Sequence, residues 1–511
     1  MTDTPWQNDA CSLVDAFRAG ERSPLEELDA TLAAIEATKL NCWSHLDPER
    51  ARKAAAEADL SLPFGGVPTG IKELEAVEGW PDTGASLVFK DRIGTETTHH
   101  VQRLLDHGGV VPVGHTTSSE FGGLNVSVTK LNGIAHNPWQ HGRTVGGSSG
   151  GSAAAVSGGL VSLACGGDGG GSIRIPAGYT GLFGMKGTFG RITRGPAAHS
   201  RPNTVVLGNL ARSVRDAARY YDVCAGIDPF DPTSLPSAGG WEKGLGTQDL
   251  KGRKVAIVPS LGVTPLEDGV EELIRTQAEA LVADTGMEVV DLDVRPPNLA
   301  AQWMMGNLST LLAELGPRWP SCAEDLTEEV ATGLFLAQAM YNLHTAAEAE
   351  RLRVLAQQEM ARAFEQVDFV IAATNPGPAF PAHAVTSNAE DDLLDWVRSS
   401  KATRLLGRGA LATMRVASSI APKLPNLVLD WASEKFPDMV AMGGLTIISN
   451  IYGNPAASIP AGTVRGLPIG MQVLGKHHQD ELVFDVALAV ERERPWPLVA
   501  PGVAEAAAVP A

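Results

Sequence analysis

The sequence is poor in positive charge and has no long apolar run. Its 511 residues include 41 Lys and Arg against 59 Asp and Glu, which gives a net charge of −18. Because nucleic-acid binders normally present a basic patch or stripe, this balance argues against direct binding of nucleic acid. No stretch approaches the roughly 18 continuous apolar residues of a membrane span. The start, MTDTPWQNDA, lacks the basic and apolar regions of a secretory signal.

Cysteine is also scarce, and its spacing excludes two classes of protein. The five cysteines are scattered, and no two of them form a CxxC pair: Cys11, Cys42, Cys165, Cys224 and Cys322. An odd number without such spacing favours a reduced cytoplasm over a disulfide framework. Neither CxxC nor HExxH spacing is present to indicate a metal site. We therefore expect a cytoplasmic protein without a bound metal.

Local patterns along the chain predict alternating helices and strands. Residues 23–26, Ser-Pro-Leu-Glu, form a capping box before a helix. From Lys254 the run KVAIV, the amphipathic run closed by Gly286, and MEVVDLDV predict a βαβ unit. LPIGMQVLG and ELVFDVALAVERE predict a late strand and helix. The sequence thus indicates an α/β fold with helices on the faces of a sheet.

Composition and pattern divide the chain into five segments. Residues 1–65 are expected to be a helical region that packs on the core, and residues 66–295 are expected to form that core. Residues 296–440 are irregular and compatible with helix, so we expect an insertion or cap. Residues 441–501 are expected to return to the core, and 502–511 to form a frayed tail.

Two serine-bearing glycine loops lie close together between residues 146 and 177. A flexible linker does not explain them, because apolar AAAVSGGLVSLAC lies between the loops and strand-like SIRIPA follows. A phosphate-binding loop of the Walker type needs GK[ST], which is absent. The remaining interpretation is a loop whose amides stabilise an oxyanion. Ser172 directly follows Gly171 and is placed as an acyl-transfer nucleophile.

Such a serine needs a base, and the choice lies between histidine and lysine. None of the 12 histidines lies in a pattern that indicates a base. A histidine in such a context is more often an ordinary surface or core residue than a ligand or base. Lys72 ends a glycine-flanked apolar segment that predicts a strand leading inward, where burial would favour its neutral form. A lysine that merely extends its charged end to solvent fits the same local pattern. We expect Glu73 to point away from Lys72, and both Glu73 and Glu75 to be surface or structural.

Together these residues resemble the amidase signature family. GVPTGIKE resembles its catalytic-lysine motif, and GGSSGGSAAAV followed by GGDGGGSIRIPAGYTGLFGMKGT resembles its signature. The resemblance covers most of residues 10–295 and 440–501. It implies a single large mixed sheet covered by helices on both faces, with a helical insertion. It also implies an amidase, a hydrolase that acts on linear amides at carbon–nitrogen bonds other than peptide bonds.

The resemblance further implies a Ser-cisSer-Lys triad and no cofactor. Ser172 is the expected nucleophile, Ser148 the bridging serine after a cis peptide, and Lys72 the base. The expected oxyanion hole consists of four backbone amides, those of Gly169, Gly170, Gly171 and Ser172. Structural support is expected from three other residues, Ser149, Asp168 and Arg174. Trp303, Met304 and Met305 are expected to line the substrate pocket, although they could equally be core residues.

Two functions follow from this resemblance. The first is a free-standing serine amidohydrolase that forms an acyl-enzyme on Ser172 and also accepts esters or carbamates. Its partners would be a small-molecule amide and water, with no nucleic acid and no membrane, in a monomer or homodimer. The alternative is the A-type subunit of a tRNA-dependent amidotransferase, which feeds ammonia to a partner. The net charge, and the absence of a Ser-Leu-Asp-Gln-like stretch after Gly190, favour the first.

Overall fold

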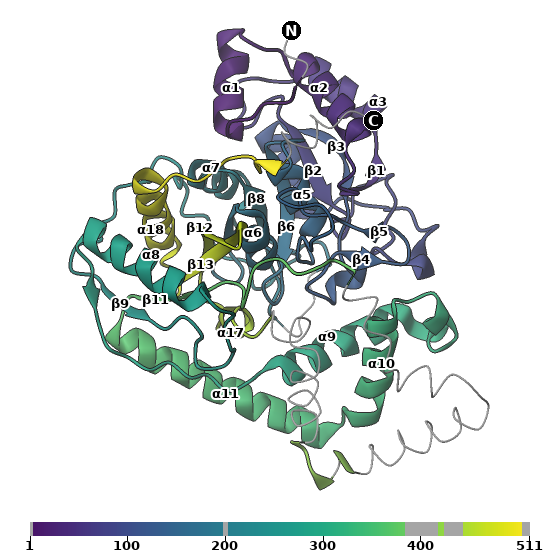
Figure 1. Cartoon of the computed structure of the whole chain (residues 1–511). Helices are drawn as coiled ribbons and strands as arrows, with labels where there is room; N and C mark the ends of the chain where they lie inside the picture. Colours follow the sequence, from purple (N-terminus) through teal and green to yellow (C-terminus); the bar gives the residue numbers. More distant parts are fainter. Residues whose placement is uncertain (1–3, 198–202, 384–416, 419, 424–442, 503–511) are drawn as a thin grey trace.

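A single mixed sheet of eleven strands runs through the described part of the chain (Figure 1). The computed structural model describes residues 4–197, 203–383, 417–418, 420–423 and 443–502. The strands of the sheet are β1 (Trp43–Leu46), β2 (Pro68–Lys72), β3 (Val111–Thr116), β6 (Leu163–Asp168), β7 (Phe183–Lys186), β8 (Val206–Ala211), β9 (Lys254–Ile257), β10 (Glu288–Val289), β11 (Phe369–Ala373), β12 (Ala456–Val464) and β13 (Leu467–Gly475). A separate hairpin pairs β4 (Val128–Thr129) with β5 (Gly133–Ile134).

The strand order is β1-β3-β2-β6-β8-β7-β12-β13-β11-β9-β10. Strands β3, β2 and β6 are parallel to one another, and so are β11, β9 and β10. The strands between these two groups pair antiparallel, and β1 joins the edge antiparallel to β3. This arrangement confirms the expected large mixed sheet.

Helices cover both faces of this sheet. The described helices are α1 (Ala10–Ala19), α2 (Pro24–Ala37), α3 (Pro48–Ala56), α4 (His99–Arg103), α5 (Gly150–Ser157), α6 (Arg174–Thr180), α7 (Val214–Cys224), α8 (Val270–Thr285), α9 (Ala300–Leu315), α10 (Glu328–Met340), α11 (Leu343–Gln366), α17 (Ile447–Tyr452) and α18 (Asp480–Glu493). Neighbouring residues of β6 point to opposite faces. Cys165 accepts a hydrogen bond from Tyr220 of α7, whereas a Cβ at Gly166 would face Ser149 at the start of α5. Helices α5 and α7 therefore lie on opposite faces.

The predicted capping box, βαβ unit, late strand (β13) and late helix (α18) are confirmed, and one predicted element is wrong. Ser23 and Glu26 form the expected capping box, and β9, α8 and β10 form the expected βαβ unit with parallel strands. The segment SIRIPA is not a strand, because α6 begins within it at Arg174. The Ile175 amide donates to the Gly171 carbonyl and starts a helical turn. Every residue of α6 is buried, so no polar face reveals its helical period.

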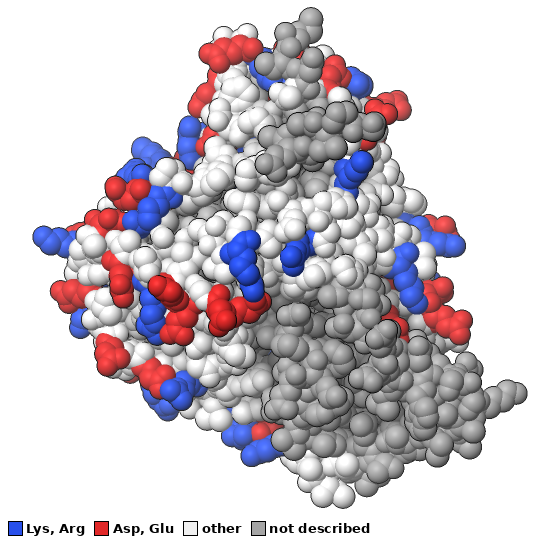
Figure 2. Space-filling view, viewed as in Figure 1, with Lys and Arg blue, Asp and Glu red and all other residues white. Residues whose placement is uncertain are grey.

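The sheet draws on segments that are far apart in the chain. Strand β11 lies inside residues 296–440, which we expected to be an insertion, and pairs with β9 and β13. The described part of that segment otherwise holds α9, α10 and α11 (green in Figure 1). No helix in the described part of the chain combines the length and apolar character that crossing a membrane requires. On the face shown in Figure 2, basic side chains are interspersed with acidic ones.

The fold brings the two glycine loops to the same edge of the sheet. Parallel strands β2 and β6 lie side by side, and their carboxyl ends are Lys72 and Asp168. The second glycine loop follows β6, and the first leads into α5, which packs on both strands. Ligands of α/β sheets commonly bind outside the carboxyl ends of parallel strands. This edge is therefore the candidate active site.

Candidate active site

Lys72 is buried at the end of β2 and contacts both serines of the first glycine loop. Its side chain is 2% exposed, and Nζ donates to Ser148 Oγ at 2.8 Å and Ser149 Oγ at 2.9 Å. Nζ also lies 3.5 Å from the Gly167 carbonyl oxygen. Burial lowers the pKa of Lys72 from its ordinary value. The amine thus lies where a proton acceptor for a serine hydroxyl is needed.

The two serines differ in how firmly they are held. The Gly147–Ser148 peptide bond is cis, as the resemblance implies. Ser149 Oγ accepts from the Gly167 amide at 3.2 Å, and the Ser149 amide donates to the Ser172 carbonyl at 3.2 Å. Within the described residues, the Ser148 hydroxyl bonds only to Lys72. Ser149 is therefore tied into the sheet, while Ser148 is free to exchange a proton.

Ser172 lies in the second loop, between β6 and α6, and is 5% exposed. Among the hydrogen bonds of the described residues, none involves its hydroxyl. The structure therefore places Ser172 against the first loop through the Ser149 amide, but does not join its hydroxyl to Ser148. Catalytic hydrogen bonds in unliganded enzymes are often long and tighten only with substrate.

The carbonyl groups of the second loop are held by side chains from distant segments. Trp303 Nε1 donates to the Gly169 carbonyl at 2.7 Å, and Thr446 Oγ1 donates to the Gly170 carbonyl at 2.5 Å. In a trans peptide the N–H points opposite to the C=O. These two bonds therefore turn the amides of Gly170 and Gly171 away from Trp303 and Thr446.

The Gly171 amide is not available to a substrate, which corrects the expected oxyanion hole. It donates to Asp168 Oδ1 at 2.7 Å and so closes the loop on itself. Gly171 has φ +127°, a conformation that favours glycine, so its role is to shape the loop. Within the described residues, the amides of Gly169, Gly170 and Ser172 have no protein acceptor. These three amides are the donors that remain for the expected oxyanion hole.

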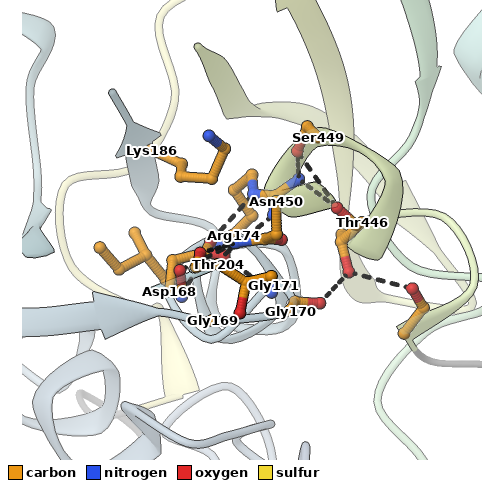
Figure 3. Close-up of polar contacts among 12 residues, drawn as sticks. Asp168, Gly169, Gly170, Gly171, Arg174, Lys186, Thr204, Thr446, Ser449 and Asn450 are labelled. Carbon is orange, nitrogen blue, oxygen red and sulfur yellow. Dashed lines mark hydrogen bonds and ion pairs between the residues drawn. The ribbon is translucent and has the colours of Figure 1, made fainter. Parts of the chain in front are cut away.

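Asp168 and Arg174 form a buried ion pair beneath the loop (Figure 3). Both are fully buried, and Arg174 Nη2 lies 2.9 Å from Asp168 Oδ1. Asn450 donates to the same carboxylate oxygen at 2.9 Å, and Ser449 accepts from Arg174 at 2.7 Å. Burial alone would raise the pKa of Asp168, but the Arg174 charge and these hydrogen bonds hold it well below its usual range. The pair fixes the loop to α17, and within the described residues it makes no hydrogen bond to the hydroxyl of Ser148 or Ser172.

The three residues expected to line the pocket have different surroundings. The indole of Trp303 lies flush on the glycine loop, since a Cβ at Gly170 would be only 2.9 Å from the ring. Met304 is half-buried and packs against the main core. The side chain of Met305 lies outside the described residues. A pocket wall formed by these residues remains a prediction.

Sequence reasoning missed the residues of α17 and the segment before it. Thr446, Ser449 and Asn450 hold the glycine loop, yet they are more than 270 residues from it in the chain. They form no recognisable motif. Only their position just before GNPAASIPAG, a segment that resembles the family's C-terminal portion, could have pointed to them.

The expectation that Glu73 and Glu75 could lie on the surface is wrong. They are 2% and 6% exposed, because β2 ends in a turn that folds both back into the protein. Glu73 accepts hydrogen bonds from the Ser118 amide at 2.6 Å and from Asn132 at 2.9 Å. Its carboxylate is thereby fixed in a structural role.

One group of metal-ligand side chains occurs in the described residues, far from the glycine loops in the chain. Ligand atoms of Asp9, Cys11 and Asp216 lie within 4.8 Å of one another. However, Asp216 already accepts from the amides of Ala10 and Cys11 at 2.9 Å, which satisfies the first turn of α1. The group is explained by helix capping.

Comparison with known proteins connects this geometry to a family. The amidase family model matches residues 26–426. The A-type subunit of glutamyl-tRNA(Gln) amidotransferase from Deinococcus deserti is 31% identical, over 94% of this chain and 96% of its own length. The corresponding protein from Akkermansia muciniphila is 29% identical, over 93% and 97%. A bacterial aryl acylamidase of the amidase signature family has a similar fold, with TM-score 0.82, 24% identity and 99% coverage of both chains.

These relatives overturn two of the expectations from sequence. A free-standing amidohydrolase is wrong as the leading function, because nearly full-length curated relatives are named as subunits of an amidotransferase. The expected partners, a small amide and water without nucleic acid in a monomer or homodimer, are wrong for the same reason. The net charge of −18 bears only on direct binding of nucleic acid by this chain and does not exclude a function like that of these relatives. The family model and the Deinococcus relative show that the chain belongs to the amidase signature family.

Proposed function

We propose that this chain is the A-type subunit of a tRNA-dependent amidotransferase. Its glycine-loop site cleaves the C–N bond of a carboxamide donor, and the ammonia released is used by a partner subunit on glutamyl-tRNA(Gln). The near full-length similarity to curated A-type subunits supports the assignment. The observation that carries the chemistry is the buried Lys72 amine, 2.8 Å from the Ser148 hydroxyl.

In the proposed reaction Lys72 is the base and Ser172 the nucleophile. Neutral Lys72 takes the Ser148 proton, and Ser148 takes the proton of Ser172 as its oxygen attacks the amide carbon. The proton returns through Ser148 to the amide nitrogen, the C–N bond breaks, and ammonia leaves. Water then hydrolyses the acyl-enzyme on Ser172 and regenerates the serine. Burial supports this role for Lys72, because it favours the free amine.

The negative charge of the tetrahedral intermediate falls on the former carbonyl oxygen. We assign its stabilisation to the amides of Gly169, Gly170 and Ser172, which have no acceptor among the described residues. Loss of one such donor commonly costs about 10²–10³ in rate. Trp303 and Thr446 hold the carbonyls behind the loop and so keep these amides in place.

The tRNA is assigned to the partner subunit. A chain with a net charge of −18 repels the phosphate backbone, and nucleic-acid affinity depends mainly on Lys and Arg contacts to phosphates. The chain thus contributes the amide-cleaving half of the reaction. A cytoplasmic location agrees with this role and with five cysteines that are all free and buried.

The test is reconstitution with amidotransferase partners. An assembly that lacks its own amide-cleaving chain is supplied with this protein, an amide donor and glutamyl-tRNA(Gln). We expect glutaminyl-tRNA formation that needs both the chain and the donor, and none with Ser172→Ala. The function is refuted if the chain alone hydrolyses small amides at full rate and never restores glutaminyl-tRNA formation.

A further inference from the structure

Glu75 is a buried carboxylate beside Lys72 that the proposed reaction does not use. The Glu75 amide donates to the Lys72 carbonyl at 2.8 Å and closes a tight turn at the end of β2. On a continuous strand these side chains would point to opposite faces, but the turn brings them together. A Cβ at Gly167 would lie 3.5 Å from Glu75 Oε1 and 3.9 Å from Lys72 Nζ. The carboxylate and the amine therefore lie on the same side of Gly167, close enough to interact through their charges.

The charge of Glu75 is not satisfied by hydrogen bonds. Within the described residues, no donor reaches its carboxylate, in contrast to Glu73, which accepts from Ser118 and Asn132. A buried carboxylate without donors is costly unless an opposite charge compensates it. Burial raises the pKa of Glu75 to about 7, and the Lys72 ammonium opposes this rise, just as the Glu75 carboxylate opposes the effect of burial on the pKa of Lys72.

His100 of α4 also lies beside the Glu75 carboxylate. Its ring is fully buried, and Nδ1 lies 3.8 Å from Glu75 Oε2. Neither ring nitrogen has a hydrogen-bond partner in the described structure. Burial, together with the charge of Arg103, lowers the pKa of His100 to about 3, so the imidazole is neutral. His100 therefore adds no charge to compete with Lys72.

The other ionisable groups around this pair complete its electrostatics. Asp168 of β6 and Glu73 also favour the ammonium form of Lys72. Cys165 of β6 and Tyr220 of α7 also feel the charge of Glu75, and burial raises the pKa of both, which keeps them neutral. Burial lowers the pKa of Lys72, and of the negative charges that oppose this shift, Glu75 has the largest effect.

We propose that Glu75 is a positioning residue that sets the protonation state of Lys72 from behind the active site. This inference rests on the proposed function, in which Lys72 is the base. Burial favours the free amine that can accept a proton, whereas Glu75 stabilises the ammonium that forms when it does so. Glu75 therefore sets the pH at which the serines become reactive.

The experiment measures how fast a fluorophosphonate labels Ser172 as a function of pH, in the purified full-length chain. Glu75→Gln removes the charge and nearly keeps the shape. With the counter-charge gone, the pKa of Lys72 falls, so the acid limb of the labelling rate should move to lower pH by about 1 unit. Glu75→Asp should keep the limb close to its wild-type position.

Glu120→Gln is the matched control, because Glu120 is also fully buried but bonds to Thr327. It should leave the acid limb unchanged. A limb that Glu75→Gln does not move, or that Glu120→Gln moves equally, overturns the inference. Absence of labelling in the wild type, or full labelling of Lys72→Ala, would instead refute the proposed chemistry.

If Glu75→Gln does not fold, the reciprocal change gives the answer. Lys72→Met removes the cation, so the pKa of Glu75 should rise further, and Glu75 should be protonated at a pH where the wild-type carboxylate is charged. An infrared difference spectrum between Lys72→Met and wild type should show one additional protonated carboxyl band. A spectrum without that band overturns the inference.

Discussion

At the residue scale, two neighbouring serines lie at nearly the same distance from one amine and have different partners. Ser148 Oγ is 2.8 Å from Lys72 Nζ, and Ser149 Oγ is 2.9 Å. Ser149 also bonds the Gly167 amide, which ties it to β6. Distance to Lys72 therefore does not separate their roles, but the hydrogen bonds around them do.

We expect Ser148→Ala and Ser149→Ala to affect different properties. Ser148→Ala breaks the proposed proton path, so kcat for ammonia release should fall by about 10²-fold or more, with little change in Tm. Ser149→Ala leaves the buried Gly167 amide without its acceptor and should destabilise the fold by about 1–3 kcal/mol. Steady-state kinetics and thermal unfolding of both variants separate the two effects. Equal loss of activity at equal stability would contradict the assignment.

Sequence patterns were informative where the chemistry is local. Lys72, Ser148 and Ser172 lie in motifs whose residues are adjacent in the chain, so the sequence alone is enough to predict them as site residues. The capture of the Gly171 amide by Asp168 was not, although the residues are only three apart, because it depends on how the loop turns. The sequence shows which hydrogen-bond donors a loop contains, but the path of the backbone decides which of them the protein itself already uses.

At the scale of elements, the glycine loop is fixed by helices from other parts of the chain. Asp168 and Arg174 connect β6 and α6 to α17 through Asn450, which is 282 residues from Asp168 (Figure 3). No local pattern encodes such a contact, because the two segments carry no shared period or spacing. The capping box at Ser23 was predictable because both of its partners lie within one turn.

Removing one partner of this ion pair should lower the free energy of unfolding of the whole protein, and not only loosen the loop. Asp168→Asn leaves the Arg174 charge buried and uncompensated, which typically costs about 3–5 kcal/mol. The folded pKa of Asp168 lies below its unfolded value, so its contribution is present above the unfolded pKa and lost as pH falls through the folded one. Because this loss occurs below the unfolded pKa of the carboxyl, urea unfolding between about pH 2 and 5 should show a smaller pH dependence for the variant. An unchanged slope would contradict the argument.

Helix α9 contacts the loop through the indole of Trp303, which also donates a hydrogen bond to it. Trp303→Phe keeps an aromatic ring but loses the N–H that bonds the Gly169 carbonyl at 2.7 Å. With the Gly169–Gly170 peptide less firmly oriented, kcat should fall by about 10-fold or more, with a smaller change in KM.

Trp319→Phe is the matched control for this change. It lies in the same segment of the chain, and its indole nitrogen has no hydrogen-bond partner in the described structure. Steady-state kinetics should show near wild-type kcat for the control. A similar loss in both variants would mean that the Trp303 hydrogen bond is not the cause of the effect.

At the scale of the whole molecule, the net charge of one chain does not predict whether it works alone or as a subunit. The net charge of −18 describes this chain by itself, yet relatives of nearly the same length are amidotransferase subunits. Fold class was predictable from alternating strand and helix patterns. The full strand order was not, because β11 joins the sheet from within a segment whose sequence looks helical.

The division of labour between subunits predicts how tRNA binds. The purified chain alone should not retard glutamyl-tRNA(Gln) in a gel at about 0.15 M salt, because its net charge of −18 opposes binding to the phosphates of RNA. The assembly with its partners should retard the tRNA with an affinity that falls as salt rises. Tight, salt-sensitive binding by the chain alone would contradict this division.

Trapping the acyl-enzyme tests the central claim most directly. The chain is mixed with an amide donor in its assembly, quenched in acid within one turnover, and digested for peptide mass mapping. The account predicts the acyl mass on the peptide that contains Ser172, and its absence in Lys72→Ala. An acyl group on another residue, or turnover that survives Ser172→Ala, would contradict it.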